Sequence, residues 1–301
     1  MDISPDQKKL SSRLHQDVTL ACVQMKVGIY KSENLTRARS LVLQAAQEGA
    51  KIVILPECFN SPYGTAYFRQ YAETLPRSPS LSPHNPQAEE PSESFRILSS
   101  TAKEAGVYLV GGSLPELDPD QGKYYNTCLC FSPDGQLLAT HRKIHLCDVD
   151  IPGKVRLQES EVLSPGNEIT IVDLPGYGRL GIAICYDVRF PELAMVAARK
   201  GCFAMVYPSV FSTVTGELHW SLLARARALD NQIYVAMCSP ARTFEKEYRA
   251  WGYSIIVDPL ARVVAEADHA EATVYARLDS LLIEDTRRNI PLDLHRRFDV
   301  Y

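Results

Sequence analysis

The sequence contains no long hydrophobic run and no strongly basic region. None of its apolar stretches approaches the roughly 18 residues that a membrane-spanning helix needs. The formal net charge is −4, and the lysines and arginines are scattered among acidic residues. A basic surface that attracts the phosphates of nucleic acid is therefore excluded. We expect neither a membrane nor a nucleic acid as a partner.

The N-terminal segment lacks the apolar core of a secretory signal. Residues 1–17 are interpreted as a polar N-terminal arm, and residues 18–301 as a single domain. Because the arm mixes aspartate with serine, lysine and arginine, the sequence predicts a cytoplasmic protein and leaves a mitochondrial presequence open as the alternative.

Disulfide and metal-binding patterns are also missing. The eight cysteines include no Cys-x-x-Cys pair, and most lie in apolar, strand-like runs, so we expect reduced thiols. His141 and His145 are four residues apart, which on a helix would suit a metal. Their segment lacks helical periodicity, so the sequence predicts no zinc site and no cofactor.

Strands and helices alternate along the chain. Residues 32–50 are expected to form a helix, with Ser32 as its N-cap and Gly49 just beyond its end. The mixture of long crossovers and hairpins predicts an α/β fold with a mixed sheet, or two sheets with helices outside. Residues 76–94 carry five prolines and are expected to form a loop.

Cys185 lies where an apolar strand, Leu180–Ile184, meets a segment of helical spacing that begins near Arg189. A thiol at such a turn faces the positive end of a helix, which is expected to lower its pKa. The alternative is an ordinary buried cysteine, since free cysteine is often found in the core.

Two further ionisable residues follow apolar strands. Glu57 ends the stretch KIVILPE, and Lys143 follows a predicted hairpin with its turn at Pro133-Asp134-Gly135. Glu57 is suited to remove the proton of a cysteine nucleophile if burial raises its pKa. Lys143 and the backbone N–H of Tyr186 are suited to stabilise an oxyanion. Each residue taken singly also fits a surface or core role.

These residues lie in motifs that resemble the nitrilase superfamily of carbon–nitrogen hydrolases. The resemblance runs from about residue 18 to the end of the chain. It implies a four-layer α-β-β-α sandwich, a homodimer and a C-terminal tail that crosses the dimer interface. It also implies a Glu57–Lys143–Cys185 triad supported by Glu159. The motifs are LPECFNSPYG, HRKIHLCDVDIPGK, QESEVLSPG, GIAICYDVRFPE and ALDNQIYVAMCSPAR.

Within the superfamily the chain is most similar to the omega-amidase branch, and the deaminated-glutathione amidase branch is the near neighbour. The branch implies a short amide with a distant carboxylate, such as alpha-ketoglutaramate or alpha-ketosuccinamate. We expect Arg189 to bind the carboxylate, unless it only pairs with Asp187 or Glu192. The residues expected to form apolar walls of the pocket are Phe59, Tyr63 and Phe211. Two departures from the branch are the long segment 76–94 and Cys147, which stands where an aromatic residue is expected.

Three other functions remain open on the sequence. The chain could be a binding protein that keeps the fold without catalysis, although the intact triad argues against this. It could be a cysteine–histidine hydrolase with His145 or His219 as the base. The same triad could also attack a nitrile.

Overall fold

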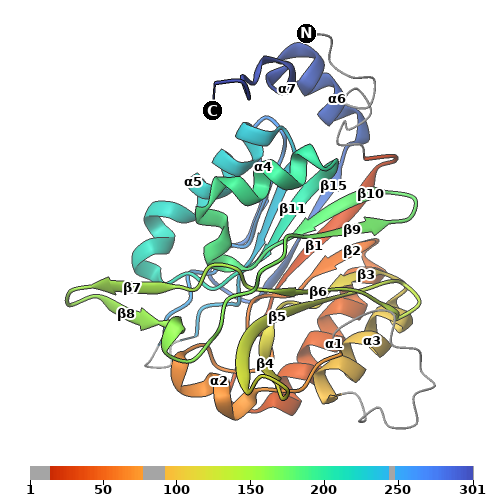
Figure 1. The fold of residues 1–301 in the computed structure, drawn as a ribbon. Coiled ribbons are helices and arrows are strands. Elements are labelled where there is room, and N and C mark those ends of the chain that lie inside the picture. Colours follow the sequence, from red (N-terminus) through yellow and green to blue (C-terminus); the bar gives the residue numbers. More distant parts are fainter. Residues whose placement is uncertain (1–13, 77–91, 244–247, 301) are drawn as a thin grey trace.

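The computed structural model describes residues 14–76, 92–243 and 248–300. Two sheets face each other, and helices cover their outer faces (Figure 1). Both sheets combine parallel and antiparallel pairs. The prediction of two mixed sheets with helices outside is therefore confirmed.

The first sheet has the order β15-β1-β2-β3-β5-β4, with β6 paired to β5. Its strands are β1 (Val18–Gln24), β2 (Ile52–Ile54), β3 (Tyr108–Val110), β4 (Leu114–Asp118), β5 (Lys123–Phe131), β6 (Leu137–Arg142) and β15 (Ala272–Leu278).

The second sheet has the order β14-β13-β12-β11-β10-β9. Its strands are β9 (Thr170–Leu174), β10 (Gly178–Ile182), β11 (Cys202–Pro208), β12 (Tyr234–Cys238), β13 (Ile255–Val257) and β14 (Val263–Glu266). A separate hairpin projects from the body of the molecule (Figure 1) and consists of β7 (Asp148–Ile151) and β8 (Val155–Gln158).

The helices form two outer layers. Figure 1 shows α1 and α3 against the first sheet and α4 and α5 against the second. The helices are α1 (Lys31–Gln47), α2 (Thr65–Tyr71), α3 (Glu93–Ala105), α4 (Pro191–Arg199), α5 (Thr213–Asn231), α6 (Ser280–Asn289) and α7 (Leu292–His295). In the described part of the chain, no helix combines the length and the apolar character that a membrane span needs.

Strand β1 is apolar from Leu20 to Val23 and is buried on both faces. Side chains alternate between the two faces of a strand. Leu20 and Cys22 point into the cluster between the sheets, whereas Ala21 and Val23 join the cluster beneath α1 and α3. A strand buried on both faces has a nearly continuous apolar run.

Helix α1 differs from its prediction at one end. It begins at Lys31 and has Tyr30 as its N-cap, so Ser32 lies inside the first turn. The first helical hydrogen bond runs from the Asn34 N–H to the Tyr30 carbonyl, which leaves Ser32 no capping role. Gly49 follows the end of the helix with φ +93°, as predicted.

Most of the proline-rich segment 76–94 falls outside the described residues, which resume at Ser92. The Ser92 hydroxyl accepts a hydrogen bond from the Phe95 N–H, and α3 begins at Glu93. Of the predicted arm, only residues 14–17 are described. Leu14 is buried in the core, and the Asp17 carboxylate pairs with Arg277 at 2.7 Å.

Candidate active site

Glu57, Lys143 and Cys185 meet at one end of the two sheets. Glu57 follows β2, and Cys185 follows β10. Strands β1, β2 and β3 run parallel, as do β10, β11 and β12. The carboxyl ends of parallel strands are the usual position for the sites of α/β proteins.

Lys143 lies just after β6 and is fully buried. Its Nζ is 2.9 Å from Glu57 Oε1 and 2.9 Å from Glu159 Oε2. Its backbone N–H donates to the Asn126 carbonyl, and its carbonyl accepts from the Gly166 N–H. The ammonium is therefore held between two carboxylates on a segment with little freedom to move.

The Glu57 carboxylate is also fully buried and has two further hydrogen bonds. Oε1 accepts from Asn126 Nδ2 at 2.8 Å, and Oε2 accepts from the Val210 N–H at 2.8 Å. Burial raises the pKa of Glu57 above its ordinary value, while Lys143 opposes that rise and Glu159 adds to it. A carboxylate with a raised pKa is suited to accept a proton and return it.

Glu159 supports Lys143 from the opposite side. It opens the short 3-10 helix Glu159–Glu161 that follows β8. Its Oε1 accepts from the Tyr63 hydroxyl at 2.9 Å, and its Oε2 accepts from the Cys147 N–H at 2.7 Å. The resemblance implied this supporting carboxylate, and the structure places it on Lys143.

Cys185 has a φ of +47°, a left-handed conformation that is rare for residues with a side chain. It opens the short 3-10 helix Cys185–Arg189 between β10 and α4. Its thiol donates to the Val210 carbonyl at 3.5 Å, and the Glu57 carboxylate is near enough for its charge to raise the pKa of the thiol. A left-handed residue at such a turn is strained, and the turn places the sulfur near Glu57.

The thiol of Cys185 is not acidified, which corrects the expectation from its position before a helix. Burial and the negative charge of Glu57 raise its pKa well above the ordinary value, although Lys143 opposes them. The sulfur therefore rests as a thiol and needs a base.

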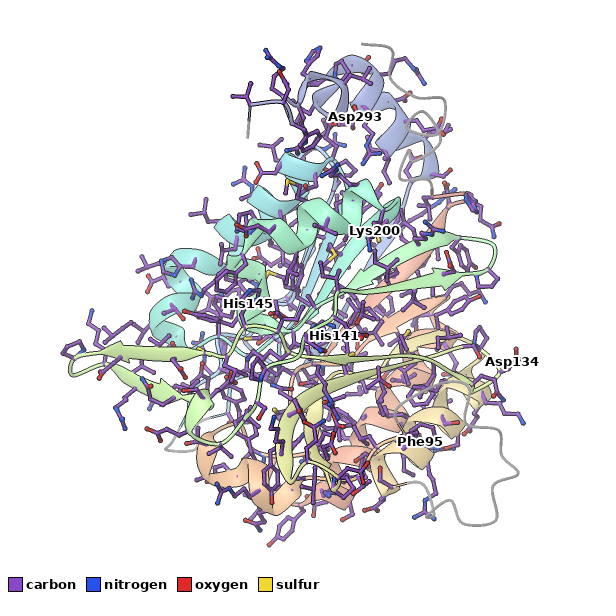
Figure 2. All side chains as sticks on the ribbon, in the orientation of Figure 1. Phe95, Asp134, His141, His145, Lys200 and Asp293 are labelled. Carbon is purple, nitrogen blue, oxygen red and sulfur yellow. The ribbon has the colours of Figure 1, made fainter. Side chains whose placement is uncertain are left out.

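Asp187 fixes the turn around Cys185. Its Oδ2 accepts from the Ile184 N–H at 2.9 Å, and its Oδ1 contacts His145 Nδ1 at 2.8 Å. Burial opposes ionisation, but hydrogen bonds from His141 and His145 hold the pKa of Asp187 well below its usual range. Figure 2 labels both histidines, His141 on β6 and His145 just after that strand.

The surroundings of His145 and His219 test the hypothesis that a histidine is the base. The His145 ring stacks on Phe190 with centroids 3.6 Å apart, and His219 Nδ1 lies 3.2 Å from Arg189 Nη1. In the described ranges, neither imidazole has a hydrogen bond to Cys185. This geometry favours Glu57 as the base.

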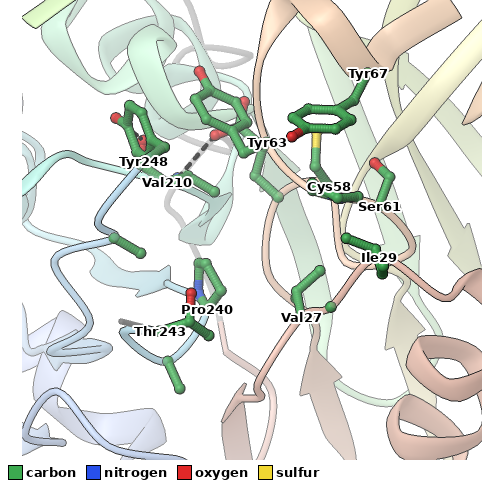
Figure 3. Close-up of a pocket in the computed structure, with 15 residues that line it drawn as sticks. Val27, Ile29, Cys58, Ser61, Tyr63, Tyr67, Val210, Pro240, Thr243 and Tyr248 are labelled. Carbon is green, nitrogen blue, oxygen red and sulfur yellow. Dashed lines mark hydrogen bonds between the residues drawn. The ribbon is translucent and has the colours of Figure 1, made fainter. Parts of the chain in front are cut away.

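A cavity of about 530 Å³ opens beside this cluster (Figure 3). Glu57, Tyr63, Val210 and Tyr248 line it, whereas Cys185 is only 2% exposed and is not among the lining residues. The remaining wall is mostly apolar and consists of Val27, Gly28, Ile29, Cys58, Ser61, Pro62, Tyr67, Pro240, Ala241, Thr243 and Ala250.

The predicted pocket residues are only partly brought together. Tyr63 lines the cavity, but Phe59 does not, and this prediction is corrected. The left-handed Cys58 turns the chain so that the Phe59 N–H bonds the Ser113 carbonyl, and the Phe59 side chain enters the core beneath α1 and α3. Phe211 is also outside the cavity lining and packs edge-on against Trp220.

Arg189 follows Cys185 by four residues and is not among the residues that line the cavity. Its guanidinium stands 5.2 Å from the Tyr186 ring centroid and 4.9 Å from that of Phe211. Its Nε is buried without a hydrogen-bond partner within the described residues. In the same residues Arg189 has no ion pair with Asp187 or Glu192, the alternative weighed from the sequence.

Three contributors to the site were not predicted from the sequence: Asn126, Val210 and Tyr248. Asn126 had a signal, because asparagine is depleted in strands, and this one interrupts the apolar run YYNTCLCF. Val210 acts through its backbone, and Tyr248 lies outside any helix or strand, so neither position carries a local pattern.

Comparison with known proteins places this geometry in a family. The carbon-nitrogen hydrolase family matches residues 19–288. Omega-amidase NIT2 of Danio rerio is 51% identical over 282 residues, which cover 94% of this chain and 95% of that protein. Omega-amidase NIT3 of Saccharomyces cerevisiae is 51% identical over 294 residues and 97% of each chain.

The solved structures agree with this result. Saccharomyces cerevisiae Nit3, described as a member of branch 10 of the nitrilase superfamily, superposes with a TM-score of 0.85 and 48% identity. The alignment covers 95% of this chain and 98% of that one. The Caenorhabditis elegans NitFhit protein superposes with a TM-score of 0.81 and 31% identity, over 95% of this chain and 66% of that one.

The buried charge cluster predicts a stability defect when Lys143 is replaced by methionine. The change leaves two buried carboxylates without their cation, so the free energy of unfolding at neutral pH should fall by about 3–5 kcal/mol. Loss of Lys143 raises the pKa of Glu57 further. The folded variant then binds more protons than the unfolded chain, and its deficit should shrink as the pH falls.

Urea unfolding at pH 7 and pH 5 measures both effects. Lys103→Met, which removes an exposed lysine of α3, serves as the control and should stay within about 0.5 kcal/mol of the wild type. A Lys143→Met protein as stable as the control at both pH values would contradict the buried ion cluster.

Proposed function

Since the chain belongs to the carbon-nitrogen hydrolase family of the nitrilase superfamily, we propose that it is an omega-amidase. It hydrolyses the terminal amide of small dicarboxylic acid monoamides, such as alpha-ketoglutaramate and alpha-ketosuccinamate, to the acid and ammonia. The observation that carries the proposal is the buried Glu57–Lys143–Glu159 cluster, which the Val210 backbone links to Cys185. The near full-length similarity to omega-amidases from fish and yeast supports the substrate class.

The first half of the reaction acylates Cys185. Glu57 takes the thiol proton as the sulfur attacks the amide carbon, and the carbonyl oxygen becomes an oxyanion. Glu57 then passes the proton to the amide nitrogen, the C–N bond breaks, and ammonia leaves. The acyl group remains as a thioester on Cys185.

The second half releases the acid. A water molecule attacks the thioester carbon and gives its proton to Glu57. A second oxyanion collapses, the C–S bond breaks, and the proton returns to the sulfur. Both halves form an oxyanion at the same place, and in both Glu57 acts first as a base and then as an acid.

Lys143 is suited to stabilise both oxyanions. An ammonium has three N–H donors. Glu57 Oε1 lies 2.9 Å from Nζ, and the two oxygens of Glu159 lie 3.0 Å and 2.9 Å from it. We propose that the Glu159 oxygens share one N–H, which leaves one for the substrate oxygen. The Tyr186 backbone N–H, next to the nucleophile, is proposed as the second donor, and such a donor contributes about 3–4 kcal/mol to the transition state.

The substrate site is proposed to lie between the cavity and Arg189. The apolar cavity wall suits the short carbon chain, and Tyr63 is the predicted wall residue that lines it. Arg189 provides a planar fork for the carboxylate, and its free Nε supports this role. The ring centroids of Tyr186 and Phe211 lie 5.2 Å and 4.9 Å from the guanidinium, and neither residue lines the cavity.

We also propose a homodimer in the cytoplasm. Leu218, Leu222 and Leu229 of α5 are each at least half exposed, and they are apolar surface that a second copy is suited to cover. All eight cysteines are free thiols, which is consistent with a reducing compartment.

Ammonia release from a panel of small amides tests the function. We expect turnover of alpha-ketoglutaramate and alpha-ketosuccinamate, and a loss of more than about 1000-fold in Cys185→Ala, since covalent catalysis ends without the nucleophile. The panel includes a longer peptide amide and a nitrile of equal length as competitors. Faster turnover of either competitor would reject the omega-amidase assignment.

The carboxylate partner is tested with a pair of substrates. Arg189→Ala should lower kcat/KM for the carboxylated amide by an amount equal to about 2–5 kcal/mol of lost transition-state stabilisation if the charge pair is buried. It should barely change kcat/KM for an uncharged amide of equal length. Arg189→Lys serves as the matched variant, because it keeps the charge but loses the planar fork. Equal losses on both amides would return Arg189 to a structural role.

A further inference from the structure

Val210 is the one residue whose backbone contacts both the proposed base and the proposed nucleophile among those described. It follows β11, and its N–H donates to Glu57 Oε2 at 2.8 Å. Its carbonyl accepts from the Cys185 thiol at 3.5 Å. The orientation of this short stretch of backbone therefore affects both reacting groups.

Tyr248 supplies the other contact of that carbonyl. Its hydroxyl donates to the Val210 oxygen at 3.3 Å. Burial raises the pKa of Tyr248 well above its ordinary value, so the hydroxyl keeps its proton at neutral pH. Figure 3 shows Tyr248 and Tyr63 near Val210 at one end of the cavity.

The two tyrosines also brace each other. Their ring centroids are 4.9 Å apart at an interplanar angle of 66°, an edge-on contact. The Tyr63 hydroxyl donates to Glu159, which holds Lys143. Tyr63 thus contacts the carboxylate that holds Lys143, and Tyr248 contacts the carbonyl that accepts from the Cys185 thiol.

We propose that Tyr248 is a positioning residue of the reaction, which fixes the Val210 carbonyl and thereby sets the approach of the Cys185 thiol to Glu57. This inference rests on the proposed function for its effect on turnover, but its effect on the thiol does not require any substrate.

The physical reason lies in the two acceptor sites of a carbonyl oxygen. One receives the Tyr248 hydroxyl and the other receives the thiol. When the thiol loses its proton, the sulfur becomes an anion beside a carbonyl oxygen that carries partial negative charge. The hydrogen bond from Tyr248 withdraws electron density from that oxygen and prevents the carbonyl from rotating, so the anion forms at a lower energy.

Tyr248→Phe tests the proposal, because it removes the hydroxyl and keeps the ring against Tyr63. The rate at which iodoacetamide alkylates Cys185, followed by mass spectrometry of its peptide, should fall about 2- to 10-fold, the range for one neutral hydrogen bond. The kcat for the amide should fall by the same factor, with KM unchanged.

Tyr207→Phe is the matched control. Tyr207 is on β11, three residues before Val210, and its buried hydroxyl has no hydrogen-bond partner within the described chain. Its removal should leave the alkylation rate, kcat and KM at wild-type values. Thermal unfolding of both variants establishes that each is folded at the assay temperature.

An unchanged alkylation rate in Tyr248→Phe would overturn the inference, and so would a rise in KM with kcat and alkylation unchanged, which would make Tyr248 a substrate contact. Slower alkylation in a protein whose wild type hydrolyses no amide would support the positioning role and reject the proposed function. The two claims can therefore fail separately.

Discussion

A lysine ammonium buried between two glutamates is the interaction on which the rest of the site depends. Neither Lys143 nor its partners Glu57 and Glu159 is exposed to solvent, so each charge has lost its hydration and relies on the others. Without water the attraction between these charges is stronger, and a charge that lost its partner would raise the free energy of the folded state. The cluster is therefore a source of catalytic charge that the fold must hold in place, rather than a source of stability.

The fold meets this demand with backbone contacts from distant parts of the chain. The Glu57 carboxylate accepts from Val210 after β11, and Glu159 accepts from the Cys147 N–H beside the projecting hairpin. Left-handed residues stand at two turns of the site, at Cys58 and at Cys185. Strain of this kind persists only where the surroundings determine the conformation. Two facing sheets provide those surroundings, because strand ends from both converge on one point.

Much of this arrangement could be predicted from the sequence. Apolar strands that each end in one ionisable residue indicated Glu57, Lys143 and Cys185, since a strand of known direction carries its last residue to the sheet edge. Glu159 was indicated by the motif resemblance alone. The burial of β1 on both faces follows from its largely apolar composition.

Other features depend on contacts that no local pattern encodes. Phe59 is two residues from Glu57, yet a single left-handed residue sends its side chain to the opposite layer. The raised pKa of Cys185 reflects burial and a carboxylate from another strand, which outweigh the helix end inferred from the sequence. Val210 contributes only backbone atoms, so its side chain carries no signal.

The most direct test of the account is the identity of the covalent intermediate. The enzyme is mixed with excess alpha-ketoglutaramate, quenched in acid during turnover, digested and analysed by mass spectrometry. The account predicts an acyl group, equal in mass to the substrate less ammonia, on the peptide that contains Cys185. An acyl group on any other cysteine, or continued ammonia release by Cys185→Ala, would contradict it.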